Sequence, residues 1–191
     1  MTIDMTRING NSGVPLVQCI NERLQKYRVR TDIQPDTERD DENAVTFIET
    51  EFPYKPSLQE VKDFVYGVKN AQIDAQILTG YYYDGASVWL STENQFNYFV
   101  AFILAVLDAV FGWLGKTFFG EGFSMFPVVF KLGTNDEPRY QSFEDMDSLK
   151  GFCLGAFQHI WGTLRTGWTE KAAIDFTPYE EALAEFTGTK R

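Results

Sequence analysis

The spacing of apolar positions along the chain indicates an N-terminal segment followed by alternating strands and helices. Between residues 16 and 29 the apolar side chains Leu16, Val17, Ile20, Leu24 and Tyr27 recur at intervals of three or four, which predicts an amphipathic helix. Residues 32–43 are polar and acidic, which predicts a loop or mobile linker. We therefore expect residues 1–44 to form an N-terminal arm. Its basic and acidic blocks are either solvated faces or an element that docks on a neighbouring subunit.

The next part of the chain carries strong local signals for a strand, a helix and a hairpin. Residues 45–52 alternate loosely between apolar and polar, which predicts an edge strand. Ser57 and Glu60 fit a capping box, so a helix should begin at residue 58 and end near Gly80. Asp84 and Gly85 lie between two β-prone runs, which favours a hairpin with a two-residue type I′ turn. Ser91 can cap the apolar helix that follows.

The C-terminal half predicts a second hairpin and two further helices. The hairpin strands are expected at residues 127–132 and 139–143, after a Gly- and Phe-rich loop at residues 116–125. A long helix should be capped by the motif at residues 142–145 and end at Gly167, and a short one should start at residue 177. The predicted fold class is α+β, a single compact domain with two β-hairpins and three to four helices plus the N-terminal arm. We expect its core at residues 45–186 and a loose tail at residues 187–191.

Residues 98–115 form an apolar run that has to be tested as a membrane helix. The run is 18 residues long and contains a single charge, Asp108, whereas a spanning helix needs about 20 apolar residues. A central aspartate is costly in a bilayer, and the flanks lack a Lys/Arg cluster that would set an orientation. We therefore expect no membrane insertion. The favoured interpretation is a helix buried on all sides, in the core or between subunits.

Composition and charge exclude several classes of function. Of 191 residues, 17 are Lys or Arg and 27 are Asp or Glu, which gives a net charge of −10. Because a general nucleic-acid binder needs a basic face, this charge argues against nucleic acid as a partner. Two cysteines cannot make a disulfide framework. The aromatic share of 16% means that much of the core must be aromatic.

Candidate catalytic and metal-binding residues are scarce. Cys153 and His159 are six positions apart on one predicted helix, about 600° around its axis, so they point to different faces and form no local dyad. Both cysteines have apolar neighbours, as buried unreactive cysteines do. The acidic clusters at residues 135–137 and 144–147 do not match an EF-hand, and no spacing selects a pair of catalytic carboxylates. We therefore expect no enzyme activity, no cofactor and no metal site.

Clustered aromatic and apolar side chains are the remaining candidates for function. Tyr and Trp are enriched where proteins meet, so rings that do not pack in the core are available to a partner. Four phenylalanines near a Gly-containing loop form either a core plug or an apolar patch that another subunit covers. The candidate interface residues are Tyr81, Tyr83, Trp89, Phe118, Phe119, Phe123 and Phe126, together with Leu16, Ile20 and Leu24 of the arm.

About two-thirds of the chain, residues 52–179, resembles a small family of uncharacterised proteins from phages and prophages of gut bacteria. The most specific matching run is VWLSTENQFNY at residues 88–98. Further matches are YKPSLQEVK at residues 54–62, PVVFKLG at 127–133, Phe143-Glu144-Asp145, His159-Ile160, Gly167-Trp168 and KAAID at 171–175. Residues 99–126 depart from the family pattern, which has a shorter and more polar connection there.

The resemblance implies a role in a virion but no active site. Related domains occur in phage tail-fibre and virion gene clusters, and no catalytic residues are assigned to them. The expected function is therefore a bacteriophage structural protein, a head- or tail-associated connector, decoration or fibre-attachment component that acts by protein–protein contacts. The expected partners are other virion proteins in a homo- or hetero-oligomer, assembled in the cytoplasm of the bacterial host. The alternative is a tail-fibre assembly helper that does not remain in the virion.

Overall fold

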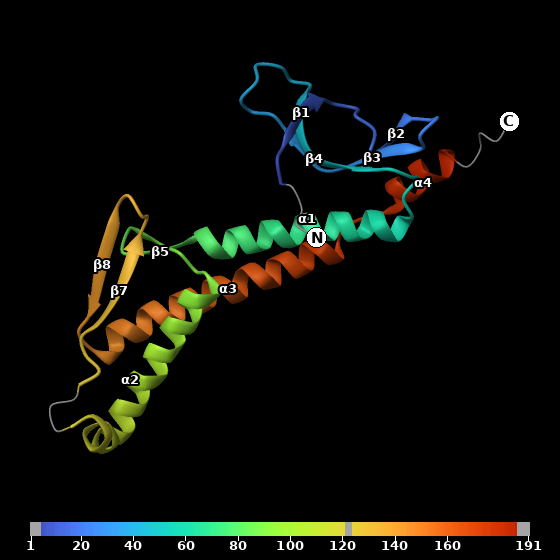
Figure 1. Cartoon of the computed structure of the whole chain (residues 1–191). Coiled ribbons are helices and arrows are strands. Elements are labelled where there is room, and N and C mark those ends of the chain that lie inside the picture. Colours follow the sequence, from blue (N-terminus) through green and yellow to red (C-terminus); the bar gives the residue numbers. More distant parts are fainter. Residues whose placement is uncertain (1–4, 121–123, 187–191) are drawn as a thin grey trace. The chain divides into compact units, whose positions relative to one another are not determined.

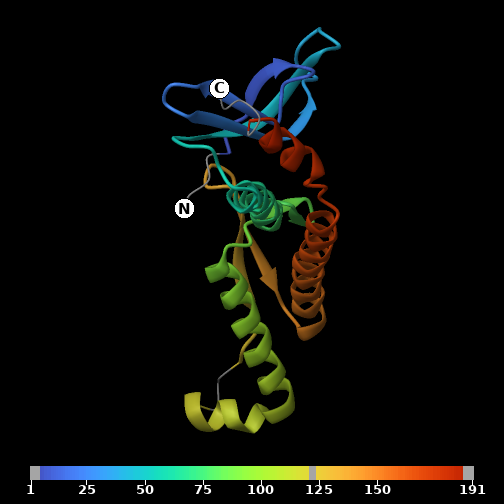
Figure 2. The same ribbon diagram turned by 90° about the vertical axis from the view of Figure 1, so that its right-hand side faces the viewer.

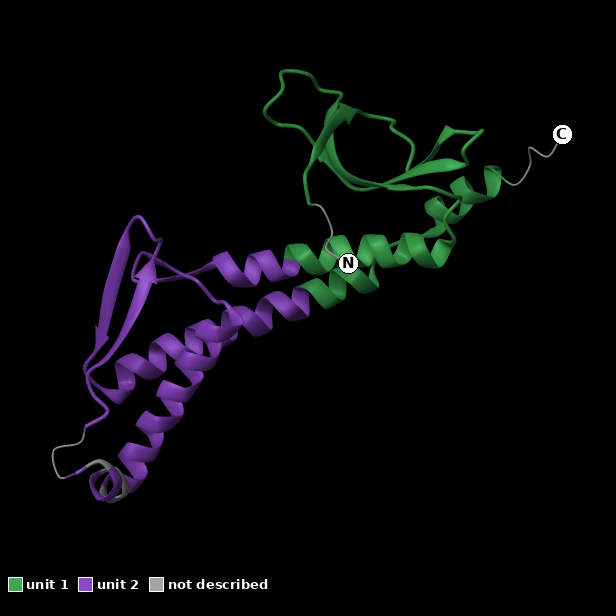
Figure 3. Cartoon of the chain, viewed as in Figure 1, with its two compact units in different colours: residues 1–72, 167–191 green, residues 73–166 purple. Residues whose placement is uncertain are grey.

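The computed structural model describes residues 5–120 and 124–186, and it has an α+β fold with helices and β-hairpins (Figure 1). The predicted fold class is therefore confirmed. The chain divides into two compact units, residues 1–72 with 167–191 (unit 1) and residues 73–166 (unit 2) (Figure 3). The predicted tail at residues 187–191 lies outside the described residues.

Unit 1 contains a four-stranded antiparallel sheet with the order β1-β4-β3-β2. Its elements are β1 (Ile8–Asn11), β2 (Val17–Asn21), β3 (Lys26–Pro35), β4 (Ala44–Phe52), the first part of α1 (Leu58–Thr79), the end of α3 (Met146–Ala172) and α4 (Thr177–Glu185). One core joins strands to helices, with buried Val29 and Ile48 from the sheet, Val61 and Val68 from α1 and Leu183 from α4.

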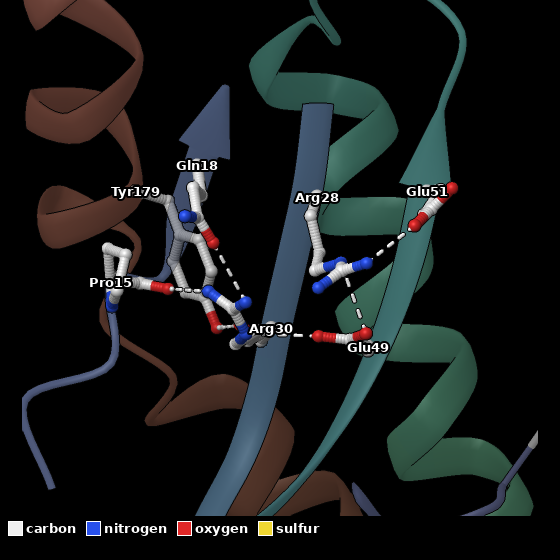
Figure 4. Close-up of polar contacts among 7 residues, drawn as sticks. All are labelled: Pro15, Gln18, Arg28, Arg30, Glu49, Glu51 and Tyr179. Atoms are coloured by element: carbon white, nitrogen blue, oxygen red, sulfur yellow. Dashed lines mark hydrogen bonds and ion pairs between the residues drawn. The ribbon is translucent and has the colours of Figure 1, made fainter. Parts of the chain in front are cut away.

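The other face of β3 is closed by ion pairs, because side chains alternate between the two faces of a strand. Arg30 is 6% exposed, and its guanidinium donates from Nε to Glu49 Oε2 at 3.0 Å (Figure 4). Its two remaining nitrogens donate to the carbonyl oxygen of Pro15 and to Gln18 Oε1, each at 2.9 Å. The buried cation thus has an anionic partner and two further acceptors, which such a charge needs in order to be tolerated.

A second arginine on the same face extends this network. Arg28 Nε lies 3.1 Å from Glu49 Oε1, and Arg28 Nη2 lies 2.7 Å from Glu51 Oε1. On the main chain, the hydroxyl of Tyr179 in α4 donates to the carbonyl oxygen of Arg30 at 2.9 Å. The two arginines of β3 are therefore neutralised by Glu49 and Glu51 of β4.

The predicted amphipathic helix at residues 16–29, and with it the helical arm, is wrong. These residues form β2, a turn and the start of β3. Leu16, Ile20 and Leu24 follow the spacing of a helix, whereas Tyr27 and Val29 follow the two-residue period of a strand. Pairing with β4 selects the strand pattern. It buries Tyr27 and Val29 on one face, and on the other face it brings Arg28 and Arg30 within reach of Glu49.

Two neighbouring predictions also change because of this sheet. The strand expected at the edge is β4, which lies in the interior of the sheet between β1 and β3. The expected loop at residues 32–43 begins with strand, since Gln34 and Pro35 pair with Thr46 and Val45 after a bulge. Asp32 occupies that bulge with a φ of 53°, a conformation that Asp tolerates better than most residues. The boundary expected after residue 44 therefore does not separate an arm from a core.

Unit 2 contains two hairpins, the helix α2 (Thr92–Phe119) and parts of α1 and α3. The first hairpin joins β5 (Tyr81–Tyr83) to β6 (Ala86–Val88), and the positive φ angles of Asp84 (48°) and Gly85 (77°) confirm the predicted turn. The second joins β7 (Val128–Gly133) to β8 (Pro138–Phe143), also as predicted. Arg139 of β8 donates to the carbonyl oxygen of Asp84 at 2.6 Å, which ties the two hairpins together.

The core of unit 2 is built around one phenylalanine of α3. Phe152 is fully buried, and five rings lie with their centroids 5.0–6.2 Å from its own. Aromatic rings at such separations stabilise one another by more than the burial of their apolar surface alone. The five rings come from both hairpins and from α2: Tyr81, Tyr83, Tyr98, Phe130 and Phe143.

The helix ends agree with the sequence where a local cap sets them. Ser57 N donates to Glu60 Oε2 at 2.8 Å and Glu60 N donates to Ser57 Oγ at 3.3 Å, which confirms the capping box of α1. Other ends differ. Asp145, not Ser142, accepts from the first turn of α3, and α3 passes through Gly167 to Ala172. The loop expected from residue 116 begins later, because α2 continues to Phe119 after an interruption at Phe111.

Phe152→Ala should destabilise unit 2 by about 3–5 kcal/mol, because it removes the ring that five others contact and leaves a cavity. Tyr140→Ala is the matched control, since Tyr140 in β8 is 71% exposed and should change stability by less than about 0.5 kcal/mol. Urea unfolding followed by near-UV circular dichroism measures both. A loss below about 1 kcal/mol for Phe152→Ala would show that this cluster does not hold the unit together.

Candidate protein-contact surface on α2 and α3

Helix α2 begins at a side-chain cap and buries only one of its faces. The hydroxyl of Ser91 accepts from Asn94 N at 3.3 Å, as the sequence predicts. Tyr98 and Ala105, seven residues apart on one face, are buried in the core of unit 2. The ring of Tyr98 lies 4.6 Å from that of Phe130 and 5.0 Å from that of Phe152. This face fixes the rotation of α2 about its axis, and so determines which side chains point away.

The uncovered face of α2 carries a continuous apolar stripe. Its members are spaced by three or four residues up to the interruption at Phe111, and their exposed fractions lie between 38% and 64%: Phe96, Phe99, Ile103, Leu107 and Val110. Such spacing places them on one side of a helix. Leu104 and Phe111 widen the stripe. Figures 1 and 2 show that the second half of α2 extends beyond the hairpins and α3 without another described helix or strand beside it.

A groove between α2 and α3 continues this apolar surface. It has a volume of about 370 Å³ and its lining residues are uncharged, among them Phe99 and Ile103 from α2 and Ile160 from α3. On the α3 side, exposed Leu154, Phe157 and Trp161 again follow a 3–4 spacing. We call the stripe of α2, the groove and these three residues of α3 the α2–α3 surface.

The thiol of Cys153 lies in this groove and is held in its neutral form. Its Sγ is 3.7 Å from the carbonyl oxygen of Tyr98, to which it donates. Burial raises the pKa of the Cys153 thiol to about 11. Because the thiolate is the nucleophile, this shift opposes any role for Cys153 in covalent catalysis at neutral pH.

The sequence-predicted interface residues on the hairpin and loop are only partly brought together. Tyr81 and Tyr83 pack against the core of unit 2, whereas Trp89 is 52% exposed. Phe118 is exposed near the end of α2, and Phe126 packs against the core. The side chain of Phe119 and the whole of Phe123 lie outside what the structure describes.

The interface residues predicted in the arm do not share a helix face. Leu16 packs against the core of unit 1, Ile20 is half-buried in β2, and Leu24 is exposed in the turn after it. These three residues share a face only in a helix, and the structure has strands and a turn at these positions instead. The α2 part of the α2–α3 surface lies mostly in residues 98–115, the run for which the sequence leaves a position between subunits open. The α3 part, Leu154, Phe157 and Trp161, is not among the predicted interface residues. The expectation that this helix is buried in the core of its own chain is wrong, because only 11% of the most apolar 18-residue stretch of α2 is buried there; burial between subunits stays a prediction.

Polar groups with catalytic potential are dispersed within the part of the chain that the structure describes. No three His, Cys, Asp or Glu residues among the described ones are grouped so that they could hold a metal ion. His159 Nε2 lies 3.0 Å from the carbonyl oxygen of Gln76, and its ring stacks on Tyr81. The histidine thus joins α3 to α1 within unit 2, and Cys153 contacts a different element.

Residues Thr92–Gly112 have the length and apolar composition of a membrane-spanning helix. In this fold, however, α2 is packed through Tyr98 against the β7–β8 hairpin, whose exposed residues include Lys131 and Arg139. A two-stranded sheet with open edges and charged side chains cannot enter the hydrocarbon layer beside the helix. The hairpin therefore opposes insertion of the part of α2 that packs beside it.

Comparisons with protein-family models, with curated proteins and with solved structures gave no match to this chain.

The raised pKa predicts slow alkylation of Cys153. At pH 8 a thiol with a pKa of about 11 is about 0.1% thiolate, so iodoacetamide should react at least about a hundredfold more slowly than with an ordinary exposed thiol. The rate should rise tenfold per pH unit up to about pH 11. Mass spectrometry of the Cys19→Ser variant measures this, with the same protein in urea as the control. Equal rates with and without urea would contradict the burial of the thiol.

Proposed function

We propose that the protein is a bacteriophage structural protein that acts through protein–protein contacts made by the α2–α3 surface. The resemblance of residues 52–179 to phage and prophage proteins supports the virion part of this proposal. The fold supports the mode of action, because the segment that departs from the family pattern includes most of the exposed apolar stripe. In this proposal the protein has no catalytic role.

The observation that carries the proposal is the size of the uncovered apolar surface. Seven residues of α2 and three of α3 are each 38–64% exposed. With roughly 150–250 Å² for a large side chain, they present an area on the order of 900 Å². The largest apolar patch on a typical monomer is about 300–600 Å², and a standard interface buries about 800 Å² per partner. The α2–α3 surface thus has the size of a complete interface.

The occupant that this surface fits best is a second copy of the chain. A groove lined by apolar side chains takes an amphipathic helix with anchors spaced by three and four residues. The stripe of α2 has that spacing and borders the groove, so one surface contains both the helix and its site. A two-fold symmetric interface requires such self-complementarity. The uncharged lining of the groove also lets two chains of charge −10 meet without burying unpaired charge there.

The wild-type protein should therefore be a dimer, and Phe99→Asp should make it a monomer. The substitution would place a charge in the centre of the buried contact, which should weaken association at least about a hundredfold. Tyr140→Asp is the control, because Tyr140 is as exposed but lies on β8 outside the α2–α3 surface. Size-exclusion chromatography with light scattering distinguishes the two states. A wild-type monomer, or a protein that sediments with lipid vesicles, would contradict pairing through this surface.

The virion role has its own test, which does not depend on the dimer. Mass spectrometry of purified particles should find the protein in multiple copies, with an even number expected if the dimer is the building unit. If the protein is abundant in the lysate of infected cells and absent from particles, the virion role is wrong and the assembly helper takes its place.

A further inference from the structure

A second surface of unit 2 lies beside the first hairpin and is separate from the groove. It is a hollow of about 680 Å³ bordered by the end of α1, the β5–β6 hairpin, the start of α2 and the turn after β7. This volume is within the usual range for small-molecule sites, about 300–1,000 Å³. Two aromatic rings line it, from Tyr82 (64% exposed) and Trp89 (52% exposed).

The backbone presents both rings on the outer face of the hairpin. Tyr81 and Tyr83 point into the core, so Tyr82 between them points outward and pairs with Ser87. Trp89 follows two residues after Ser87, and its neighbours Val88 and Leu90 are fully buried. The carbonyl oxygen of Trp89 accepts from Asn94 Nδ2 at 2.8 Å, which holds this segment on the first turn of α2. The rings therefore stand on a supported backbone.

The polar side chains of the hollow are mostly uncharged and keep unused hydrogen-bonding groups. Asn94 uses its Nδ2 for the carbonyl oxygen of Trp89, which leaves Oδ1 as an acceptor. Asn135 uses its Oδ1 for Lys131 Nζ at 3.4 Å, which leaves Nδ2 as a donor. The hydroxyl of Ser87 can both donate and accept. Within the described lining, Lys131 is the single charged residue.

We propose that this hollow binds a neutral saccharide. A pyranose ring has an apolar C–H face that can lie on an aromatic ring, and its hydroxyls both donate and accept hydrogen bonds. Tyr82 and Trp89 supply the rings, while Ser87, Asn94 and Asn135 supply donors and acceptors of both kinds. The ligand is expected to be an oligosaccharide rather than a single sugar, because two rings and several polar groups are spread along the hollow.

Two other ligand classes fit this chemistry less well. A proline-rich peptide also binds aromatic grooves, but its proline residues offer acceptors without N–H donors. The proline residues would then offer no donor to Asn94 Oδ1, whereas a saccharide hydroxyl can donate to it. A nucleic acid would bring phosphates to a chain of charge −10. The proposal is independent of the α2–α3 surface and goes beyond the proposed structural role.

The test uses the full-length protein labelled with ¹⁵N and four probes: maltotriose, cellotriose, mannotriose and chitotriose. At least one trisaccharide should bind with a millimolar or lower dissociation constant and shift the indole N–H signal of Trp89. Trp89→Ala and Tyr82→Ala should each weaken that binding about tenfold, the effect of losing one stacked ring. Trp89→Phe, which keeps a ring, should lose less.

Trp168→Ala is the matched control, because Trp168 is 54% exposed on the part of α3 that belongs to unit 1 and should leave binding unchanged. Circular dichroism of each variant shows whether it is folded. The proposal is overturned if none of the four trisaccharides binds, or if folded Trp89→Ala binds as tightly as the wild type. It is equally overturned if a proline-rich decapeptide shifts the Trp89 signal and the trisaccharides do not.

Discussion

The packing of five aromatic rings around Phe152 determines which surfaces of unit 2 remain uncovered. These rings come from β5, α2, β7 and β8, so a single residue of α3 sets the rotation of each element against the core. Because Tyr81 and Tyr83 face inward, the alternation of a strand turns Tyr82 outward. Because Tyr98 and Ala105 face inward, the helical period leaves Phe96, Phe99 and Ile103 on the uncovered side of α2. Both candidate binding surfaces thus follow from the same packed core.

In unit 1 the same alternation of side chains along a strand gives a closed face instead of an uncovered one. There the face of β3 that does not meet the helices is closed by Arg30 and Arg28, which bind Glu49 and Glu51. Taking Arg30 out of water is costly, and the acceptors supplied by Glu49, Gln18 and the carbonyl of Pro15 offset that cost. Arg28 and Arg30, which lie at the end of the predicted helix, are therefore paired with acidic residues within the sheet. The uncovered apolar surface of the chain is concentrated in unit 2.

The features that the sequence predicts correctly are those set by neighbouring residues. Asp84 and Gly85 need positive φ angles, Ser57 and Glu60 cap each other, and Ser91 caps α2, so each is readable from a few letters. Residues 16–29 are different, because their apolar positions satisfy both a helical and a strand period. Pairing with β4, about 20 residues away, decides between the two. The same limit applies to the candidate surfaces. The stripe of α2 is visible in the sequence, but only tertiary packing shows that no described residue of unit 2 covers it. Trp89, a predicted interface residue, is exposed, whereas Tyr82 is exposed in place of the predicted Tyr81 and Tyr83, because strand alternation turns it to the outer face.

The two proposed surfaces of unit 2 can operate at the same time. Asn94, which supports Trp89, and Phe96, which begins the apolar stripe, are two residues apart, about 200° around the axis of α2. A second copy seated on the stripe would therefore leave the hollow beside the hairpin open. A two-fold dimer would then present two identical hollows, and a repetitive saccharide that spans both would bind more tightly than one that reaches a single hollow. If, as proposed, a particle carries many copies of the protein, weak binding at each hollow is compatible with firm attachment, because the copies raise the effective concentration of sites.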